Sequence, residues 1–299
     1  MDENPEVILL YGDIGNKLFD PIKAAFPDRA LNCGVAEANM VTVAAGLASV
    51  GFRPFVYTIS SFLYLKALEQ IKLDLCHPSL AVTLVGTGGG LSYSSLGTTH
   101  HSLEDFAVLG ALPNISLYNP ADSQELEACL EHLISNSGPT WLRLGKKGEP
   151  DLPIGPIPFE VGSPIGGRLV FGDGRSETAI LGTGVPVFES AAAAEVVKSM
   201  GLAVDVWSIP QLKPFPFEQI RREIGRYKSL VVVEEHVPSG GLASLVQSTF
   251  WGLMEPEITT LNSGDRFHFA TGEPAEARKS IHQTRGQIVD LLLKMLPSS

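Results

Sequence analysis

Cysteine is scarce in this sequence. Only Cys33, Cys76 and Cys129 occur among its 299 residues. Their number is odd, and none lies near another in the paired spacing that structural zinc sites and disulfide frameworks require. The sequence therefore excludes a small disulfide-rich domain, and we expect all three thiols to be reduced and structural.

Basic residues are also in the minority. The chain has 22 Lys and Arg against 33 Asp and Glu, which gives a formal net charge of −11. Because the acids are spread along the whole length and repel polyanions, we expect no binding to nucleic acid or to an anionic membrane surface. A small anionic substrate would need a local lysine or arginine.

Long apolar runs are missing as well. The most apolar stretch, residues 40–52, is shorter than the roughly 18 residues that a bilayer span requires. We expect it to form a buried helix that is apolar on enough faces to take part in an interface between subunits. The N-terminus shows neither the basic start nor the apolar segment of a secretory signal, so we expect a cytoplasmic protein.

What the sequence does contain is a regular alternation of short β-rich runs and helical stretches. Such alternation predicts an α/β fold of two domains, each a largely parallel sheet flanked by helices on both faces. A segment rich in proline and glycine interrupts the alternation and predicts a linker. We therefore expect a first domain over residues 1–147, a linker over 148–167 and a second domain over 168–299. The expected strands are 7–11, 52–57, 80–85, 115–118, 141–144, 178–181, 204–207 and 230–233, and the expected helices of the second domain are near 186–200, 241–252 and 274–295.

An acidic residue stands at the start of the apolar helix. Glu37 lies in the run Asn32-Cys33-Gly34-Val35-Ala36-Glu37-Ala38-Asn39-Met40. A carboxylate in a first helical turn is favoured by the helix dipole by about 0.3–1 kcal/mol, so a structural role is one interpretation. The other is functional, because a helix too apolar to face water would partly desolvate this carboxylate and let it share a proton with a ligand nitrogen.

This run resembles Gly-Ile-Ala-Glu-Gln-Asn-Met, a signature of the pyrimidine-binding domain of the transketolase family. The resemblance continues in order along nearly the whole chain and implies the C-terminal section of a transketolase, a pyrimidine-binding domain followed by a C-terminal-like domain. It is carried by Phe62-Leu63 with Ala67, Glu69, Gln70 and Ile71, by Thr99-His100-His101, by Leu112-Pro113-Asn114 and Asn119-Pro120-Ala121-Asp122, and by Val233-Glu234-Glu235-His236 with Gly240-Gly241-Leu242.

The resemblance implies a half-site for thiamine diphosphate. Glu37 would hydrogen-bond the ring nitrogen of the aminopyrimidine and favour the imino form, which removes the proton from the thiazolium carbon. Phe62 would stack on the pyrimidine, although core packing demands the same residue type. Ile59 stands where the family has a further aromatic residue. Asp13 resembles an acid that lies near the cofactor where two subunits meet, but it could equally cap a helix.

Substrate contacts are implied mainly by the Gly/Ser/Thr-rich loop at 86–102. His100 resembles the family histidine that contacts substrate oxygens, and we assign it a catalytic role; His101 is the weaker candidate. Leu96 stands where the family has an aspartate that contacts sugar hydroxyls, which puts ordinary sugar acceptors in doubt. Basic candidates for gripping a substrate phosphate are Lys146, Arg143 and Lys17, with plain surface solvation as the alternative for the two lysines.

The metal-binding half of the family's cofactor site is missing. The family anchors the diphosphate through Mg²⁺ with a Gly-Asp-Gly motif and a later asparagine. Gly172-Asp173-Gly174 is followed by no asparagine until Asn262, and it stands between two expected strands, so we interpret it as a hairpin turn. We expect no metal site in this chain. A separate N-terminal subunit would hold Mg²⁺ and the diphosphate, and the two chains would share thiamine diphosphate in an α2β2 assembly.

Three functions are compatible with these features. The leading hypothesis is the β-like half of a split transketolase, which moves a two-carbon ketol unit from a ketose or ketose phosphate to an aldehyde or oxo acceptor. An alternative is decarboxylating condensation of an oxo acid, as in deoxyxylulose phosphate synthase, whose loop also reads Thr-His-His. A third is a non-catalytic scaffold or regulatory subunit. Retention of Glu37, Phe62 and His100 favours catalysis, because packing alone does not require the carboxylate.

Overall fold

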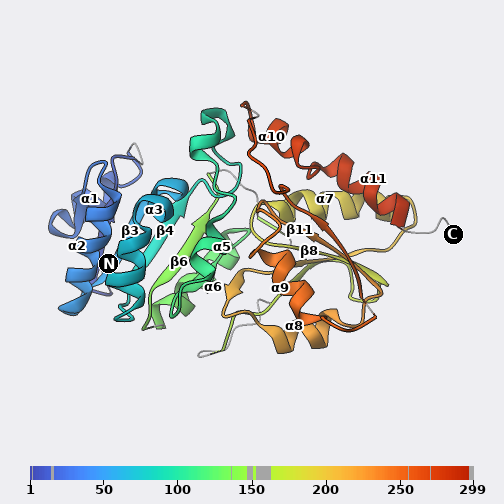
Figure 1. Ribbon diagram of the computed structural model, residues 1–299, viewed down its shortest axis with the longest axis horizontal. Helices are drawn as coiled ribbons and strands as arrows, with labels where there is room; N and C mark the ends of the chain where they lie inside the picture. The colour runs from blue at the N-terminus through green and yellow to red at the C-terminus, as the bar shows by residue number, and fades with distance from the viewer. Residues whose placement is uncertain are drawn as a thin grey trace.

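The computed structural model of the chain has two α/β units side by side, with the N-terminus in the first and the C-terminal end in the second (Figure 1). It describes residues 1, 3–14, 17–135, 137–146, 151–152, 163–254, 256–269 and 271–295. Most of the expected linker, 148–150 and 153–162, lies outside the described residues. The predicted α/β fold with two largely parallel sheets is confirmed.

The first sheet has seven strands in the order β10-β5-β6-β4-β3-β1-β2. All neighbouring pairs are parallel except β10 with β5. Five of its strands match the expected runs to within a few residues. The strands are β1 (Val7–Tyr11), β2 (Ala30–Asn32), β3 (Arg53–Ile59), β4 (Thr83–Thr87), β5 (Ser116–Tyr118), β6 (Thr140–Leu144) and β10 (Gln211–Lys213).

Strand β10 comes from the second half of the chain and closes one edge of the first sheet. Its Lys213 donates hydrogen bonds from Nζ to the backbone carbonyls of Gly110 and Leu112, which belong to the first unit. The sequence did not predict this strand, because three residues are too short to display a period. The two units are therefore joined through a shared sheet.

The second sheet has five strands in the order β12-β11-β8-β9-β7, all parallel except β7 with β9. The expectation that Gly172-Asp173-Gly174 forms a hairpin is wrong, because β9 lies between the two strands that this turn connects. The turn is held by the buried Asp205 carboxylate, which accepts the backbone N–H groups of Asp173 and Gly174 at 3.2 Å each. The strands are β7 (Arg168–Phe171), β8 (Thr178–Gly182), β9 (Asp205–Ser208), β11 (Ser229–Val233) and β12 (Glu257–Leu261).

Helices cover both sheets. In the second unit α7 and α11 lie on one face, and α8 and α9 lie on the other (Figure 1). The helix expected over 274–295 is in fact two helices, because the chain turns at His282, which has φ 59°. The helices are α1 (Asp20–Ala25), α2 (Glu37–Ser49), α3 (Ser60–Lys66), α4 (Leu68–Gln70), η2 (Ile71–Cys76, a π-helix), α5 (Asp105–Gly110), α6 (Ser123–Ser135), α7 (Pro186–Ser199), α8 (Phe217–Ile224), α9 (Leu242–Thr249), α10 (Pro274–Ser280) and α11 (Arg285–Met295).

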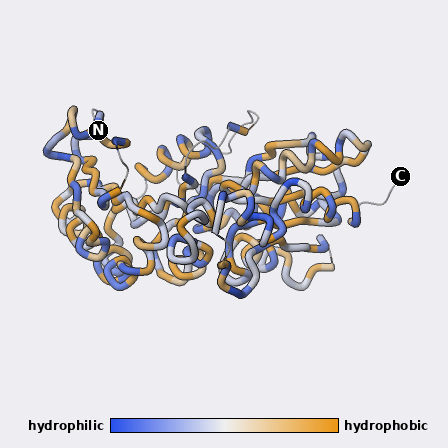
Figure 2. The backbone as a smooth tube through the Cα atoms, turned by 90° about the horizontal axis from the view of Figure 1, so that it is seen from above, coloured by the Kyte–Doolittle hydropathy of each residue, from blue (hydrophilic) through white to orange (hydrophobic). Residues whose placement is uncertain are grey.

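One hydrophobic cluster runs from the first sheet into the second. Apolar segments accordingly occur in both units when the molecule is seen from above (Figure 2). Helix α2 buries Met40 and Ala44 completely in this cluster, whereas Val43 and Val50 are 39% and 73% exposed. Burial of each large apolar side chain contributes about 1.5–3 kcal/mol, so α2 is fixed firmly on the sheet. Its exposed valines are consistent with the expected interface between subunits, which stays a prediction.

Candidate active site

The expected site residues follow the carboxyl ends of several strands of the first sheet. Because β1, β2, β3, β4 and β6 are all parallel, these ends meet at one edge. Asp13 follows β1, Glu37 follows β2, Phe62 follows β3, and Lys146 follows β6. The loop after β4 carries His100. This edge is where open α/β sheets place their ligands.

Glu37 is the first residue of α2 and is only 6% exposed. The turn before it is fixed by two hydrogen bonds, from Gly34 N to Asn32 Oδ1 at 2.8 Å and from Asp13 N to Gly34 O at 3.1 Å. Gly34 has φ +68°, and nothing lies within 4 Å of the place where a side chain would begin. The sequence thus builds a buried carboxylate behind an open approach.

A lysine and an aromatic ring complete the immediate surroundings of this carboxylate. Lys66 Nζ lies 3.3 Å from Glu37 Oε2 and 4.4 Å from the centre of the Phe62 ring. Glu37 and Phe62 therefore flank the same ammonium group. Ile59, the last residue of β3, stands three positions before Phe62, at the entry to α3. Sequence reasoning missed Lys66, although its spacing of four residues from Phe62 on a helix predicts a common face.

His100 joins this group from the loop after β4. Its ring centre lies 4.9 Å from that of Phe62 and 6.3 Å from that of Tyr93. Thr99 Oγ1 is hydrogen-bonded to His100 Nδ1 at 3.0 Å, and partial burial lowers the pKa of His100. The imidazole is therefore neutral near pH 7 and has Nε2 available for a ligand. Tyr93 was also missed, and an aromatic residue in a Gly/Ser-rich loop was the signal for it.

The position of this loop is set by α3 and by the second unit. Ser61 Oγ donates to Thr99 O at 3.1 Å, and the hydroxyls of Ser60 and Ser102 are 2.7 Å apart. From the other side, Ser94 and Thr98 donate to carbonyls of the loop before α10, those of Gly272 and His268. His100 is consequently held against Phe62 by both units.

Lys146 and Leu96 lie at the margin of the group. Lys146 is exposed, and its Nζ lies 5.5 Å from the Tyr93 ring centre, which brings a positive charge near His100. Leu96 is 54% exposed on the same loop as His100. Because an exposed leucine offers no hydrogen bond, it cannot replace the contact that an aspartate would make with a sugar hydroxyl.

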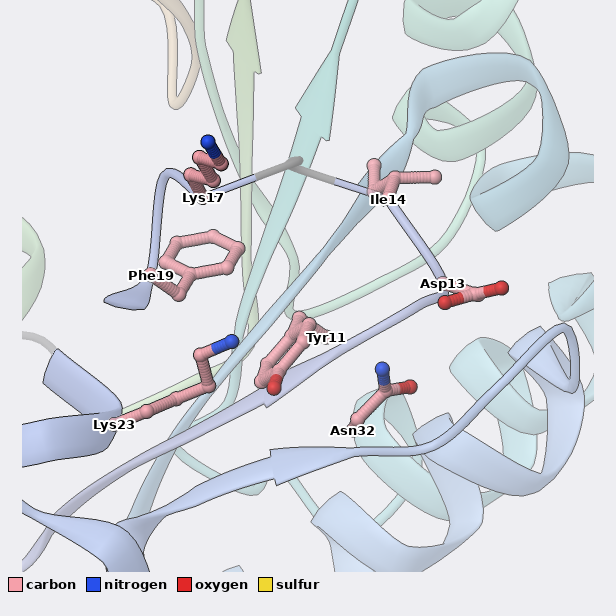
Figure 3. Close-up of a pocket in the computed structure, with 7 residues that line it drawn as sticks. All are labelled: Tyr11, Asp13, Ile14, Lys17, Phe19, Lys23 and Asn32. Atoms are coloured by element: carbon pink, nitrogen blue, oxygen red, sulfur yellow. The ribbon is translucent and has the colours of Figure 1, made fainter. Parts of the chain in front are cut away.

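Asp13 and Lys17 line a separate cavity of about 360 Å³ beside the carboxyl ends of β1 and β2. Figure 3 shows Lys23 extending toward Tyr11, whereas Asp13 and Lys17 stand well apart. Asp13 remains linked to the Glu37 turn through its hydrogen bond to Gly34. Lys17 makes no contact that connects it with His100 among the described residues.

The prediction that Arg143 grips a substrate does not fit the structure. Its side chain is only 5% exposed, and Nη1 lies 3.0 Å from Oδ1 of the fully buried Asp105. Nη2 donates to the backbone carbonyl of Glu235 in the second unit at 2.9 Å, and the guanidinium lies 4.7 Å from the Phe106 ring centre. Arg143 is therefore a buried tie between the units, with its donors directed away from solvent.

His101 also differs from His100 in its surroundings. It is only 6% exposed, and neither ring nitrogen has a hydrogen-bond partner among the described residues. Burial and the neighbouring His268 lower the pKa of His101. The two adjacent histidines thus face different environments, and only His100 contacts Phe62.

The loop after β11 presses on the His100 loop from the second unit. Glu235 accepts the backbone N–H of Leu91 at 2.9 Å and pairs with Arg278. Burial raises the pKa of Glu234 to about 7 and lowers that of His236 to about 4. His236 Nε2 accepts Ala107 N–H at 3.3 Å. These buried polar groups were quoted in the sequence only as part of a family pattern, and the structure gives them a cross-domain role.

Two exclusions apply to the part of the chain that the structure describes. It contains no group of three or more His, Cys, Asp or Glu side chains that could hold a metal ion. Its helices also fall short of the length and hydropathy that crossing a membrane demands.

Comparison with known proteins identifies the family. The model of the transketolase pyrimidine-binding domain matches residues 1–149, and that of the transketolase C-terminal domain matches residues 169–264. One of the two apulose-4-phosphate transketolase subunits of Actinobacillus succinogenes is 31% identical over 277 residues, which cover 92% of this chain and 87% of that protein. The chain belongs to the transketolase family. Members of this family depend on thiamine diphosphate.

Further relatives show which part of a transketolase the chain represents. It is 32% identical over 218 residues to 6-deoxy-6-sulfo-D-fructose transketolase subunit SqwH from Clostridium sp., covering 73% of this chain and 66% of that protein. A split-gene transketolase, solved as an inactive beta4 tetramer, superimposes with a TM-score of 0.85 at 29% identity and covers 98% of this chain and 93% of that one. This transketolase chain therefore corresponds to the C-terminal subunit of a split enzyme.

Full-length relatives match over less than half of their length. The 1-deoxy-D-xylulose-5-phosphate synthase of Anaeromyxobacter dehalogenans is 33% identical over 285 residues, which are 93% of this chain but 44% of that enzyme. The transketolase of Campylobacter jejuni has a TM-score of 0.77 at 17% identity, a likeness of fold alone.

Proposed function

We propose that this chain supplies the pyrimidine side of a thiamine diphosphate site and that a separate N-terminal subunit supplies the diphosphate and Mg²⁺ side. The single observation that carries the proposal is the buried Glu37 carboxylate, which lies behind an open approach and beside the Phe62 ring. The assembled enzyme would transfer a two-carbon ketol unit from a ketose or ketose phosphate to an aldehyde or oxo acceptor. An α2β2 stoichiometry and a cytoplasmic location belong to the same proposal.

The residues present fit the pyrimidine half of the cofactor. A buried carboxylate needs a hydrogen-bonding partner, and among the described residues Glu37 has only the half-exposed Lys66. A heterocycle placed against Phe62 would gain an aromatic contact and bring a ring nitrogen within reach of Glu37. When bound, the cofactor would supply an electron sink for the carbanion at the substrate carbon.

The chain's own side chains would then divide the work. Glu37 would hold a proton between its Oε2 and the ring nitrogen, and Phe62 would orient the ring. The neutral His100, held by Thr99, would contact a substrate oxygen, and Lys146 would attract an anionic substituent as a point charge. Asp13 and Ile59 would border the cofactor, whereas Leu96 would leave part of the acceptor without a hydrogen bond.

The proposal is tested by mixing the chain with a subunit that carries the Gly-Asp-Gly and Asn motif, thiamine diphosphate and Mg²⁺. We expect the circular dichroism band of bound cofactor to appear only in the mixture. The Glu37→Gln variant should still assemble but lose at least about 10²-fold in turnover, because proton transfer steps contribute on that order. Full activity in that variant would contradict the proposed role of Glu37.

A second candidate reaction is a decarboxylating condensation. It is favoured by the 33% identity to a deoxyxylulose phosphate synthase over 93% of this chain and by the Thr99-His100-His101 loop. The two reactions differ in one product, since only the condensation releases CO₂ from a pyruvate donor. Measurement of CO₂ release by the assembled enzyme decides between them.

A further inference from the structure

Lys66 has no role in the proposed function, yet it makes the closest contact with its central carboxylate. It is the last residue of α3, where a cation is favoured by the helix dipole. The helix terminus alone does not explain its conformation, however. The side chain runs back along the helix, over the Phe62 ring and onto Glu37 Oε2.

The ammonium group lies between two surfaces that the cofactor would use. It is 3.3 Å from the Glu37 carboxylate oxygen and 4.4 Å from the centre of the Phe62 ring. A stacked heterocycle would approach Phe62 to about 3.5–4 Å and would put a nitrogen within hydrogen-bond reach of Glu37. The ammonium and the heterocycle cannot both occupy that place.

The interaction is also of a kind that a ligand can displace. The Lys66 side chain is 54% exposed, whereas that of Glu37 is 7% exposed. Ion pairs with one exposed partner are weak, and the long, flexible lysine stem can turn into solvent without disturbing the core. Among the described residues, Lys66 is the one cation that pairs with Glu37.

We propose that Lys66 is a resident counter-ion that occupies the place of the cofactor ring in the free chain and is displaced when the cofactor binds. The inference rests on the proposed function and adds a regulatory cost to it. In the free chain Lys66 neutralises the buried Glu37 carboxylate. Cofactor binding must break the ion pair and the cation–π contact before Glu37 and Phe62 can receive the ring.

The test is titration of thiamine diphosphate into the assembled enzyme at fixed Mg²⁺, followed by circular dichroism. Lys66→Ala removes the side chain and should lower the apparent Kd by about 3- to 10-fold, the size expected from losing one exposed ion pair and one cation–π contact. Lys66→Gln should behave similarly, and Lys66→Arg should resemble the wild type because it keeps the charge. Lys72→Met, at an exposed lysine of η2, is the matched control and should leave Kd unchanged.

The outcomes separate this inference from the function on which it rests. If the wild-type mixture binds no cofactor, the proposed function fails and the inference fails with it. If the wild type binds but Lys66→Ala has an unchanged or a higher Kd, only the counter-ion role is overturned. A direct readout in the free chain uses ¹³Cε-labelled lysine, whose Lys66 resonance should shift in the Glu37→Gln variant. An unshifted resonance would contradict the ion pair.

Discussion

Replacement of Arg143 by methionine separates a structural role from a substrate-binding one. In the structure this guanidinium has one ion pair with the fully buried Asp105 and one hydrogen bond to the carbonyl of Glu235. Methionine would fill much of the same volume but would leave the Asp105 carboxylate with Trp141 Nε1, at 3.0 Å, as its remaining side-chain partner. Removing one partner of a buried pair costs about 3–5 kcal/mol, because the other charge stays buried without compensation.

The assay is urea denaturation of the chain at pH 7, with the free energy of unfolding taken from the midpoint and slope. Arg143→Met should lower it by about 3–5 kcal/mol. The double variant Asp105→Asn with Arg143→Met should recover much of the loss, because it removes the unpaired charge. Lys146→Met is the control: this exposed lysine follows the same strand, and its loss should change stability by less than about 0.5 kcal/mol. An unchanged midpoint in Arg143→Met, together with a raised KM in the assembled enzyme, would refute the reasoning.

Two other predictions concern pH and specificity. Because burial raises the pKa of Glu234 to about 7, the folded chain keeps a proton that the unfolded chain releases from about pH 4.5 upward, so this residue lowers stability as pH rises through that window. Glu234→Gln should therefore gain about 3 kcal/mol relative to the wild type between pH 4.5 and 7, by urea midpoints, and a loss would contradict the buried, protonated side chain. Leu96→Asp should raise kcat/KM for a hydroxyaldehyde acceptor about 10-fold with little change in stability, because the site is exposed and a charged hydrogen bond is gained. Equal selectivity in both enzymes would show that Leu96 does not contact the acceptor.

The strands that were predicted correctly are those with a local signal. Val7–Tyr11 and Ser229–Val233 are apolar runs of five residues, and such runs identify buried parallel strands. Strands β2 and β10 have three residues each and gain their pairing from distant neighbours, so no local pattern reveals them. The single helix expected over 274–295 failed for a related reason, because the left-handed backbone at His282 is not visible in hydrophobic periodicity.

The site shows the same division. Glu37 was identified from its turn and its apolar helix, and the structure places it at the first position of α2, buried as expected. Arg143 was misassigned because it follows the family's order at the end of a strand. Trp141 and Arg143 share one face of β6 and both bond Asp105. Alternation along the strand could indicate the shared face, but only the tertiary structure brings the carboxylate there. The roles of Glu37, Phe62 and His100 stay predictions.

Cofactor retention tests the half-site most directly. Equilibrium dialysis would measure labelled thiamine diphosphate bound, in the presence of Mg²⁺, to this chain alone, to the N-terminal subunit alone and to their mixture. The account predicts stoichiometric binding in the mixture and none by this chain alone. Stoichiometric retention of cofactor and metal by this chain alone would contradict it.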